Sequence, residues 1–244
     1  MKNLSIVFLS VVLLVSCNEA TSNKGKLIEK VIIKSNEAQI VANEPSSDTI
    51  FTFINCEPGE FPTGWSRHFT GKKGEKPNWK IVEDNGTKVL AQLSEDNPNY
   101  HFNEIVYDGF EFKNVELKVK MKGVRGEMDQ GGGFVWRFID ADNYYVVRAN
   151  PLEDNVVLYK VKNGKRTDLP VLGKGRTYGV DVKPLGKGWN NLKLTVMDDL
   201  FTVYLNNEQI FQVKDDTFTN AGKIGLWTKA DAVSYFSEFQ IKSL

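Results

Sequence analysis

The sequence predicts an all-β domain, a two-sheet antiparallel jelly-roll sandwich that follows a signal peptide and a tether. Three observations carry this prediction: period-two alternation, turn signals at intervals of about ten residues, and no convincing amphipathic helix. The clearest alternation runs from Val115 to Lys122, where apolar and charged residues take turns without an error. About 195 residues remain after the tether, which suits one sandwich core.

Segments rich in β-forming residues follow one another, separated by turn sequences. Asp84-Asn85-Gly86, Asn163-Gly164, Asp198-Asp199 and Asn206-Asn207 are expected reversals, because Asn, Asp and Gly tolerate the backbone of tight hairpins. The strand-forming segments are 50–55, 79–82, 88–93, 115–122, 132–139, 143–149, 155–161, 176–183, 189–197, 200–213 and 221–242.

The N-terminus has the parts of a lipoprotein signal in order. Met1-Lys2-Asn3 carries one positive charge, and the run from Leu4 to Val15 is apolar except for two serines. As a helix this run would span about 18 Å, too short for a hydrocarbon core of about 30 Å. Leu14-Val15-Ser16-Cys17 resembles the bacterial lipobox, which implies cleavage before Cys17 and its lipidation. The alternative is an ordinary secretory signal with an incidental cysteine.

These features divide the chain into three parts. Residues 1–16 are the expected signal peptide, 17–49 the lipidated cysteine with a flexible tether rich in Asn, Ser, Glu and Lys, and 50–244 the jelly roll. The acyl chains would hold the protein in the cell envelope, outside the cytoplasm, and provide its contact with the membrane. Lys+Arg 31 balance Asp+Glu 31, so no general basic field favours nucleic acid as a partner. Cys56 is expected to be a small buried residue.

The middle of the domain allows a guess at which face each side chain occupies. With a hairpin loop at 140–143, Ile139 pairs with Tyr144, Trp136 with Val147 and Phe134 with Ala149. The expected core face then holds Phe134, Trp136, Phe138, Tyr145 and Val147, joined after a turn at 150–154 by Val157, Tyr159 and Val161. The opposite face gathers Arg137, Tyr144, Arg148 and Lys160.

The C-terminal strand adds to this opposite face. If Ile224 and Leu226 point into the core, then Trp227 and Lys229 lie on the side of the arginines. Guanidinium groups beside aromatic rings suit a hydroxyl-rich or carboxylate-bearing sugar, since arginine donates paired hydrogen bonds. Two alternatives stay open: the ordinary solvent-exposed side of a sandwich, and a tryptophan buried under a loop.

Acidic residues in the flanking loops are further candidates. Asp140, Asp142, Asp154 and Asp231 would supply hydrogen-bond acceptors beside the ligand. A set of oxygen donors in two turns, Asp140, Asp142, Asn143 and Asp154, is a candidate Ca²⁺ site.

Four motifs carry a resemblance to a known family: 131–137 (GGGFVWR), 140–145 (DADNYY), 148–155 (RANPLEDN) and 225–231 (GLWTKAD). They resemble bacterial secreted proteins grouped with the 3-keto-disaccharide hydrolase domain, also called domain of unknown function 1080. That domain is similar to the concanavalin A-like lectin/glucanase jelly roll, which includes laminin G modules. The resemblance implies a carbohydrate partner and a ligand on the concave sheet face.

One departure bears on activity. Family 16 glucanases carry a Glu-x-Asp-x-x-Glu strand, whereas the nearest string here, 127–132, ends in Gly132 and is expected to form a loop. Whether the protein is an enzyme is therefore open. The leading expectation is a membrane-anchored domain that binds or processes carbohydrate. The alternatives are a 3-keto-glycoside hydrolase or lyase and a non-catalytic laminin G-like adhesion module.

Overall fold

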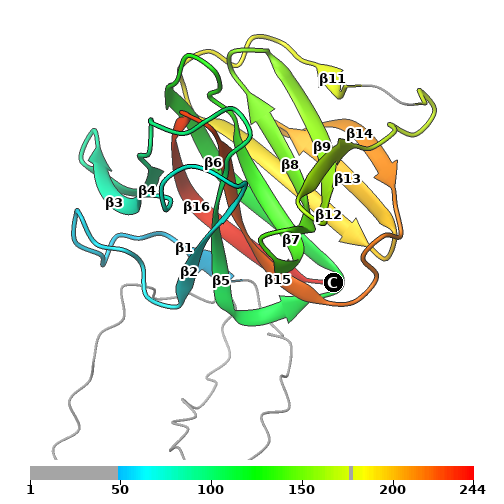
Figure 1. Cartoon of the computed structure of the whole chain (residues 1–244), viewed down its shortest axis with the longest axis horizontal. Coiled ribbons are helices and arrows are strands. Elements are labelled where there is room, and N and C mark those ends of the chain that lie inside the picture. The colour runs from blue at the N-terminus through cyan, green and yellow to red at the C-terminus, as the bar shows by residue number, and fades with distance from the viewer. Residues whose placement is uncertain (1–48, 176–177) are drawn as a thin grey trace, which may run out of the picture.

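The computed structural model describes residues 49–175 and 178–244, and this part of the chain consists of strands and the turns between them, without helices. Two antiparallel sheets face each other (Figure 1). Sheet A has the order β14-β13-β12-β6-β16-β4-β3, with β1 paired to β16. Sheet B has the order β10-β9-β8-β7-β15-β5-β2, with β11 paired to β9. The predicted all-β sandwich is confirmed.

The strands of sheet A are β1 (Thr49–Phe51), β3 (Trp79–Asp84), β4 (Thr87–Gln92), β6 (Val115–Arg125), β12 (Asn190–Met197), β13 (Leu200–Leu205), β14 (Glu208–Lys214) and β16 (Val233–Ser243). Those of sheet B are β2 (Trp65–Thr70), β5 (Phe102–Phe112), β7 (Gly132–Asp140), β8 (Asn143–Asn150), β9 (Asn155–Lys162), β10 (Lys165–Asp168), β11 (Val180–Asp181) and β15 (Gly222–Lys229). The sequence segments missed β2, β5 and β10. The predicted signal peptide, Cys17 and tether lie outside the described residues, except for Thr49.

Period two decides which side of β6 is buried. Val115, Leu117, Val119 and Met121 belong to the core between the sheets, while the intervening Glu and Lys side chains face outward. Cys56 is fully buried in the same core. The described part of the chain contains no helix long and apolar enough to cross a membrane.

The tight turns form where Asn, Asp and Gly predicted them. Asn163 (φ 51°) and Gly164 (φ 73°) join β9 to β10, and Asn206 (φ 49°) and Asn207 (φ 70°) join β13 to β14. Both residues of each turn have positive φ, as a type I′ hairpin requires. These turns set the register of the strands that they connect.

The register of the β7–β8 hairpin differs from the prediction because β7 contains a bulge. Asp140 pairs with Asn143 as expected, but Trp136 pairs with Tyr145, so three residues of β7 stand opposite Tyr144 alone. Arg137, the first of the three, has a left-handed backbone with φ 46°. Such a bulge redirects the side chains that follow it. Phe134, Trp136, Tyr145 and Val147 still lie in the inter-sheet core as predicted, whereas Phe138 turns to the other face.

A second register error affects β9. Arg148 pairs with Val157 and Tyr145 with Lys160, so Val157, Tyr159 and Val161 lie on the outer face of sheet B, and Val156 and Leu158 enter the core. A shift of one residue moves every side chain of a strand to the opposite face. The predicted core assignment of these three residues is therefore wrong.

The outer face of sheet B is concave, as a single side chain shows. The guanidinium carbon of Arg166 lies 4.7 Å from the ring centroid of Phe102 on β5 and 4.5 Å from that of Tyr159 on β9. These strands are four positions apart in the sheet, about 19 Å if it were flat. The sheet must therefore curl around Arg166. The curled face is filled by its own buried side chains, among them Val106, Val135, Tyr144 and Trp227.

Candidate functional site

The predicted basic face divides between the two sides of sheet B. Tyr144, Arg148 and Trp227 lie on the concave face, as predicted, but they are 0%, 2% and 0% exposed. Ile224 and Leu226 point into the core, which is the condition under which Trp227 was assigned to this face. Arg137 and Lys160 lie toward the inter-sheet side, so no single surface gathers the predicted set.

Arg137 holds three loops together instead of facing a ligand. Its guanidinium group donates to the carbonyls of Phe218 (2.5 Å), Lys113 (3.2 Å) and Asp198. Burial lowers the pKa of this guanidinium group. The bulge in β7 is the reason for the change of side.

Lys160 binds the loop that follows β14. Its Nζ donates to Asp215 Oδ2 at 2.8 Å, and the hydroxyl of Tyr145 donates to Asp215 Oδ1 at 2.6 Å. Burial alone would raise the pKa of Asp215, but the hydrogen bonds from Lys160, Thr217 and Tyr145 lower it below its usual value. This cluster closes one end of the core.

Arg148 is enclosed on the concave face. It donates to Asn155 Oδ1, to Glu153 Oε2 at 2.8 Å and to the hydroxyls of Tyr159 (3.3 Å) and Tyr178 (3.4 Å). An arginine with this many protein partners has a structural role in the sheet. Trp227 is covered in the same way, since Phe102 packs 5.4 Å from it between ring centroids. The buried-tryptophan alternative is thus the observed one.

Three of the predicted residues support loops. Asp231 accepts hydrogen bonds from the backbone N–H groups of Glu127, Met128 and Asp129, at 2.7, 3.0 and 3.0 Å. Lys229 pairs with Asp129 at 3.2 Å. Residues 127–131 therefore form the predicted loop, tied to the end of β15 by these contacts, and β7 begins at Gly132. Asp154, in turn, accepts from the N–H of Leu185 at 2.9 Å.

The calcium candidates do not meet. Asp140, Asp142 and Asn143 lie at the start of β8, whereas Asp154 follows its end, about 25 Å away for an eight-residue strand. Asp140 Oδ1 accepts from the N–H of Asp142 and the amide of Asn143 within the same turn. Among residues 49–175 and 178–244 no group of three or more His, Cys, Asp and Glu side chains is placed to hold a metal ion. The two turns were wrongly taken as neighbours.

A buried carboxyl that sequence reasoning missed lies at the centre of the concave face. Glu104 Oε1 accepts from the hydroxyl of Tyr144 at 2.9 Å. The single hydroxyl proton of Thr70 has two possible acceptors, Glu104 Oε1 at 3.0 Å and the carbonyl of Ala141 at 2.5 Å. Burial raises the pKa of Glu104 to about 8. Burial, and then the proximity of Glu104, raise the pKa of Tyr144 well above its usual value. This pair joins β5 and β8 beneath the rim of the sheet.

An open hollow lies directly beyond this pair, at the rim of the concave face. We call it the rim pocket; its volume is about 510 Å³, and it is lined by Gly71, Lys72, Lys73, Pro98, Tyr100, Asp142, Asn163 and Gly164. Four connections meet here: β2 to β3, β4 to β5, β7 to β8 and β9 to β10. Asp142 is a predicted loop acceptor that the structure brings into this pocket.

Tyr100 forms an aromatic wall of the rim pocket, with its side chain half exposed at 47%. Its hydroxyl accepts from the N–H of Arg166 (2.7 Å) and donates to the carbonyl of Gly164 (3.1 Å), and its ring lies 4.8 Å from that of Phe102. The ring is therefore held in place. The segment Asn97-Pro98-Asn99-Tyr100, a turn sequence that ends in an aromatic residue, was the signal that sequence reasoning overlooked.

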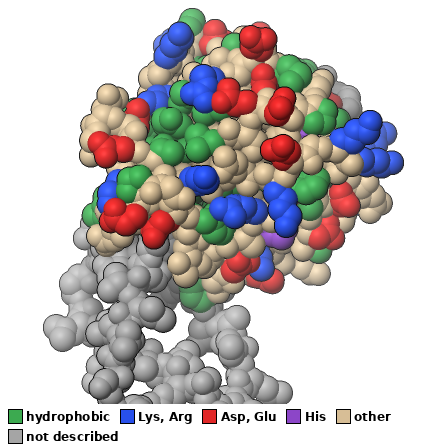
Figure 2. Space-filling model, turned by 60° about the vertical axis from the view of Figure 1, so that its left-hand side comes forward, with side chains coloured by type: hydrophobic (Ala, Val, Ile, Leu, Met, Phe, Trp, Pro, Cys, Tyr) green, Lys and Arg blue, Asp and Glu red, His purple; other side chains and the backbone are tan. Residues whose placement is uncertain are grey.

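The facing walls are equally well supported. His101 Nδ1 donates to the carbonyl of Lys73 at 2.8 Å, and its ring stacks on Phe69 at 4.9 Å. On the other side, the N–H of Gly164 donates to the carbonyl of Asp142 at 3.0 Å, which joins the two hairpin turns. Acidic and basic side chains are interspersed over the side of the molecule that carries β1 to β4 (Figure 2).

Comparison with solved structures places this architecture among known folds. The carbohydrate-binding module CBM66 from Bacillus subtilis superposes with a TM-score of 0.55 at 19% identity, covering 74% of this chain and 96% of that module. A Bacteroides ovatus mixed-linkage glucan GH16 protein in complex with G4G4G3G product gives a TM-score of 0.51 at 10% identity, covering 75% and 96%. This chain has the concanavalin A-like jelly-roll fold.

Two further matches cover only part of the matched protein. The GH43 protein BlXynB from Bacillus licheniformis matches with a TM-score of 0.51 at 12% identity, over 76% of this chain and 38% of that protein. A 63-residue segment is 30% identical to "Protein EFR3 homolog B" of Danio rerio, and the match spans 22% of this chain and 8% of that protein. No protein-family model matches the chain. The 3-keto-disaccharide hydrolase resemblance stays a prediction.

Proposed function

We propose that this domain binds carbohydrate in the rim pocket. The observation that carries the proposal is Tyr100, an exposed ring fixed at the wall of a pocket that also presents lysine, carboxylate and amide groups. The apolar C–H face of a sugar ring packs on such an aromatic surface, while its hydroxyls exchange hydrogen bonds with Asp142 and Asn163. Because the ring is held before binding, little side-chain entropy is lost when a ligand arrives.

The size and the fold support the same proposal. A volume of about 510 Å³ lies in the range typical of small-molecule sites. CBM66 is named as a carbohydrate-binding module, and the GH16 structure holds an oligosaccharide product. Carbohydrate is therefore the ligand class that we propose for this chain as well.

Binding is proposed in preference to hydrolysis. Hydrolysis of the common kind needs two carboxyl groups on either side of the scissile bond. Asp142 is the single carboxylate among the residues that line the rim pocket, and Glu104 is sealed beneath Thr70 and Tyr144. We further propose that lipidated Cys17 anchors the domain in the cell envelope, outside the cytoplasm; the order of charge, apolar run and lipobox supports this anchor.

The test is binding of the mature protein to an array of oligosaccharides, followed by titration calorimetry with the best ligand. Tyr100→Ala is expected to weaken binding about tenfold or more, and Asp142→Asn by a smaller factor. Leu152→Ala removes an apolar side chain that is also 47% exposed and does not line the rim pocket, and it serves as the matched control. Equal affinity for Tyr100→Ala and the unchanged protein would contradict the proposed site.

A further inference from the structure

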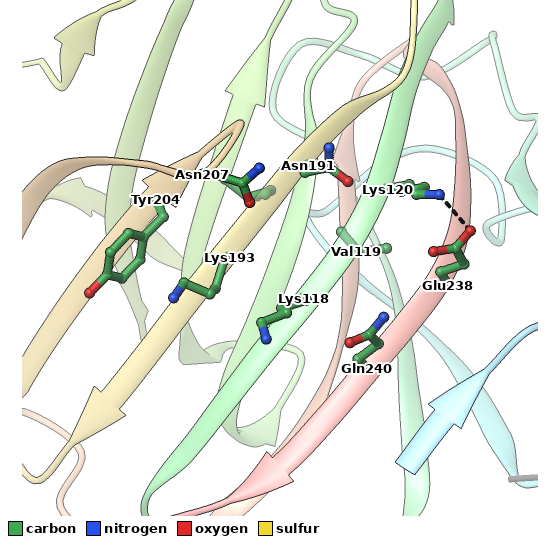
Figure 3. A pocket seen from close by; sticks show the side chains of 10 residues that line it. Lys118, Val119, Lys120, Asn191, Lys193, Tyr204, Asn207, Glu238 and Gln240 are labelled. Carbon is green, nitrogen blue, oxygen red and sulfur yellow. Dashed lines mark hydrogen bonds and ion pairs between the residues drawn. The ribbon is translucent and has the colours of Figure 1, made fainter. Parts of the chain in front are cut away.

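The outer face of sheet A carries a second hollowed surface, remote from the rim pocket on sheet B. Two hollows of about 340 and 310 Å³ adjoin each other there and share Lys120, Asn191 and Glu238 in their walls. We call the continuous surface the lysine groove. Figure 3 shows its first part, in which Lys118, Lys120 and Lys193 extend between neighbouring strands and Lys120 reaches Glu238.

Strand register builds the floor of the groove. Tyr204, Lys193, Lys118 and Gln240 form one row across β13, β12, β6 and β16, because each is the direct partner of the next. Four adjacent strands span about 14 Å, enough for an extended ligand that crosses the sheet. Beneath this row, Leu117, Leu192 and Leu194 fill the core, so the platform is rigid.

Each of the three lysines in the groove lies beside a carboxylate, although Lys118 and Lys193 share one. Glu116 lies 2.8 Å from Lys118 Nζ and 3.6 Å from Lys193 Nζ, and Glu238 lies 2.6 Å from Lys120 Nζ. A polyanion would have to compete with these carboxylates for the ammonium groups. A neutral hydroxyl-rich ligand finds donors and acceptors side by side without breaking an ion pair.

Aromatic rings stand in both hollows. Tyr204 lines the first, with Lys193 Nζ 3.8 Å from its ring centroid, and Trp189 lines the second with 38% of its surface exposed. Lys122 Nζ lies 5.1 Å from the centroid of Trp189. Both rings are partly open to solvent and held in place by a cation–π contact. Such rings offer stacking surfaces for the C–H faces of sugar rings.

Glu238 is held in an uncommon conformation at the junction of the two hollows. Its φ is 51°, and the register of β16 against β6 shifts between Ser237 and Gln240. A left-handed backbone at a residue other than glycine costs about 1–2 kcal/mol and is found preferentially at functional sites. The bulge interrupts the regular alternation of β16 and turns the Glu238 carboxylate into the groove, next to Lys120.

We propose that the lysine groove is a second carbohydrate-binding site, selective for a neutral oligosaccharide chain. The observations that support the lysine groove come from residues that do not line the rim pocket. Because the two sites lie on opposite sheets, one polysaccharide with many repeats can engage both, either on one molecule or by bridging two. Linked binding of this kind raises the apparent affinity for long chains above that for short ones.

The experiment compares the mature protein without substitutions with its Tyr204→Ala, Trp189→Ala and Tyr100→Ala variants. Each is tested on an array of neutral and uronate-containing oligosaccharides. Affinity electrophoresis follows, in gels that contain mixed-linkage glucan or polygalacturonate. Tyr204→Ala and Trp189→Ala are each expected to weaken binding to a neutral glycan about tenfold. Tyr204→Phe keeps the ring and is expected to retain binding. Thermal unfolding of each variant checks that it is folded.

The outcomes separate the two sites. Loss of binding in Tyr204→Ala and Trp189→Ala, with affinity unchanged between low and high salt, supports the groove and its neutral ligand. If only Tyr100→Ala loses binding, the lysine groove is overturned and the rim pocket is supported. If only Tyr204→Ala and Trp189→Ala lose binding, the rim pocket is overturned and the lysine groove is supported. Preference for polygalacturonate with affinity that falls steeply with salt overturns the neutral class, because screening weakens ionic contacts.

Discussion

The hydroxyl of Tyr144 donates a hydrogen bond to Glu104 Oε1 at 2.9 Å and so joins β8 to β5 across two intervening strands of the concave sheet. The contact is fully buried. Because burial raises the pKa of Glu104 to about 8, its carboxyl is mainly protonated at neutral pH. The curl of the sheet makes this contact across the sheet possible. Because the folded state holds the proton of the Glu104 carboxyl more tightly, the stability of the fold depends on pH.

Glu104→Gln is expected to change that dependence. The unfolded chain loses the proton near the ordinary value of 4.5, while the folded chain keeps it up to about pH 8. The stability contributed by this group is therefore complete below pH 4.5 and is lost as pH rises through 8. Chemical denaturation should show the variant about equal to the unchanged protein at pH 4.5 and more stable by roughly 2–4 kcal/mol at pH 8.5. Glu111→Gln, on an exposed part of β5, is the control, and parallel pH profiles for all three proteins would contradict the expectation.

Arg148→Ala is expected to act on folding. The change leaves the buried side-chain oxygen of Asn155 without its donor, which costs about 1–3 kcal/mol, and it also removes packing from the concave face; Glu153, whose side chain is 36% exposed, can be hydrated instead. Urea denaturation measures the loss. Arg125→Ala, which removes an exposed arginine paired with Glu95, should change the free energy of unfolding by about 1 kcal/mol or less. Similar stabilities for the two variants would argue against a structural role of Arg148.

Gly133→Ala is expected to destabilise the fold through a backbone clash. A Cβ at this position would lie 1.9 Å from the carbonyl oxygen of Val147 on the adjacent strand, so β7 and β8 would have to separate. The cost should reach several kcal/mol and lower the unfolding temperature clearly. Gly188→Ala is the matched control, because a Cβ there meets nothing within 4 Å. A Gly133→Ala protein as stable as the control would show that the strands adjust freely.

Cys17→Ser is expected to release the protein from membranes. Serine has no thiol to carry the diacylglycerol group, so the variant should move from the detergent phase to the aqueous phase in a detergent partition, and mass spectrometry should show the loss of the lipid mass. Cys56→Ser tests whether the effect belongs to position 17. Detergent-phase partition of Cys17→Ser at the level of the unchanged protein would rule out the proposed anchor.

The sequence alone determined the fold class and most of its turns. Alternation in 115–122 placed Leu117 and Val119 in the core, and the Asn-Gly and Asn-Asn pairs marked hairpins that the structure contains. These features depend on neighbours in the chain, through the two-residue period of a strand and the φ preferences of Asn and Gly. Local chemistry is enough to predict them.

The tertiary structure decided which side chains meet. The bulge at Arg137 and the one-residue register of β9 moved Arg137 and Lys160 away from Tyr144, and neither event has a signal in the residues concerned. The curl of sheet B sealed Arg148 and Trp227, and it brought Tyr100 beside Asp142 and Asn163 from separate loops. Strand register and sheet curvature are set by packing between distant segments, and this is why the sequence predicted the sandwich correctly but not which of its candidate side chains lie together.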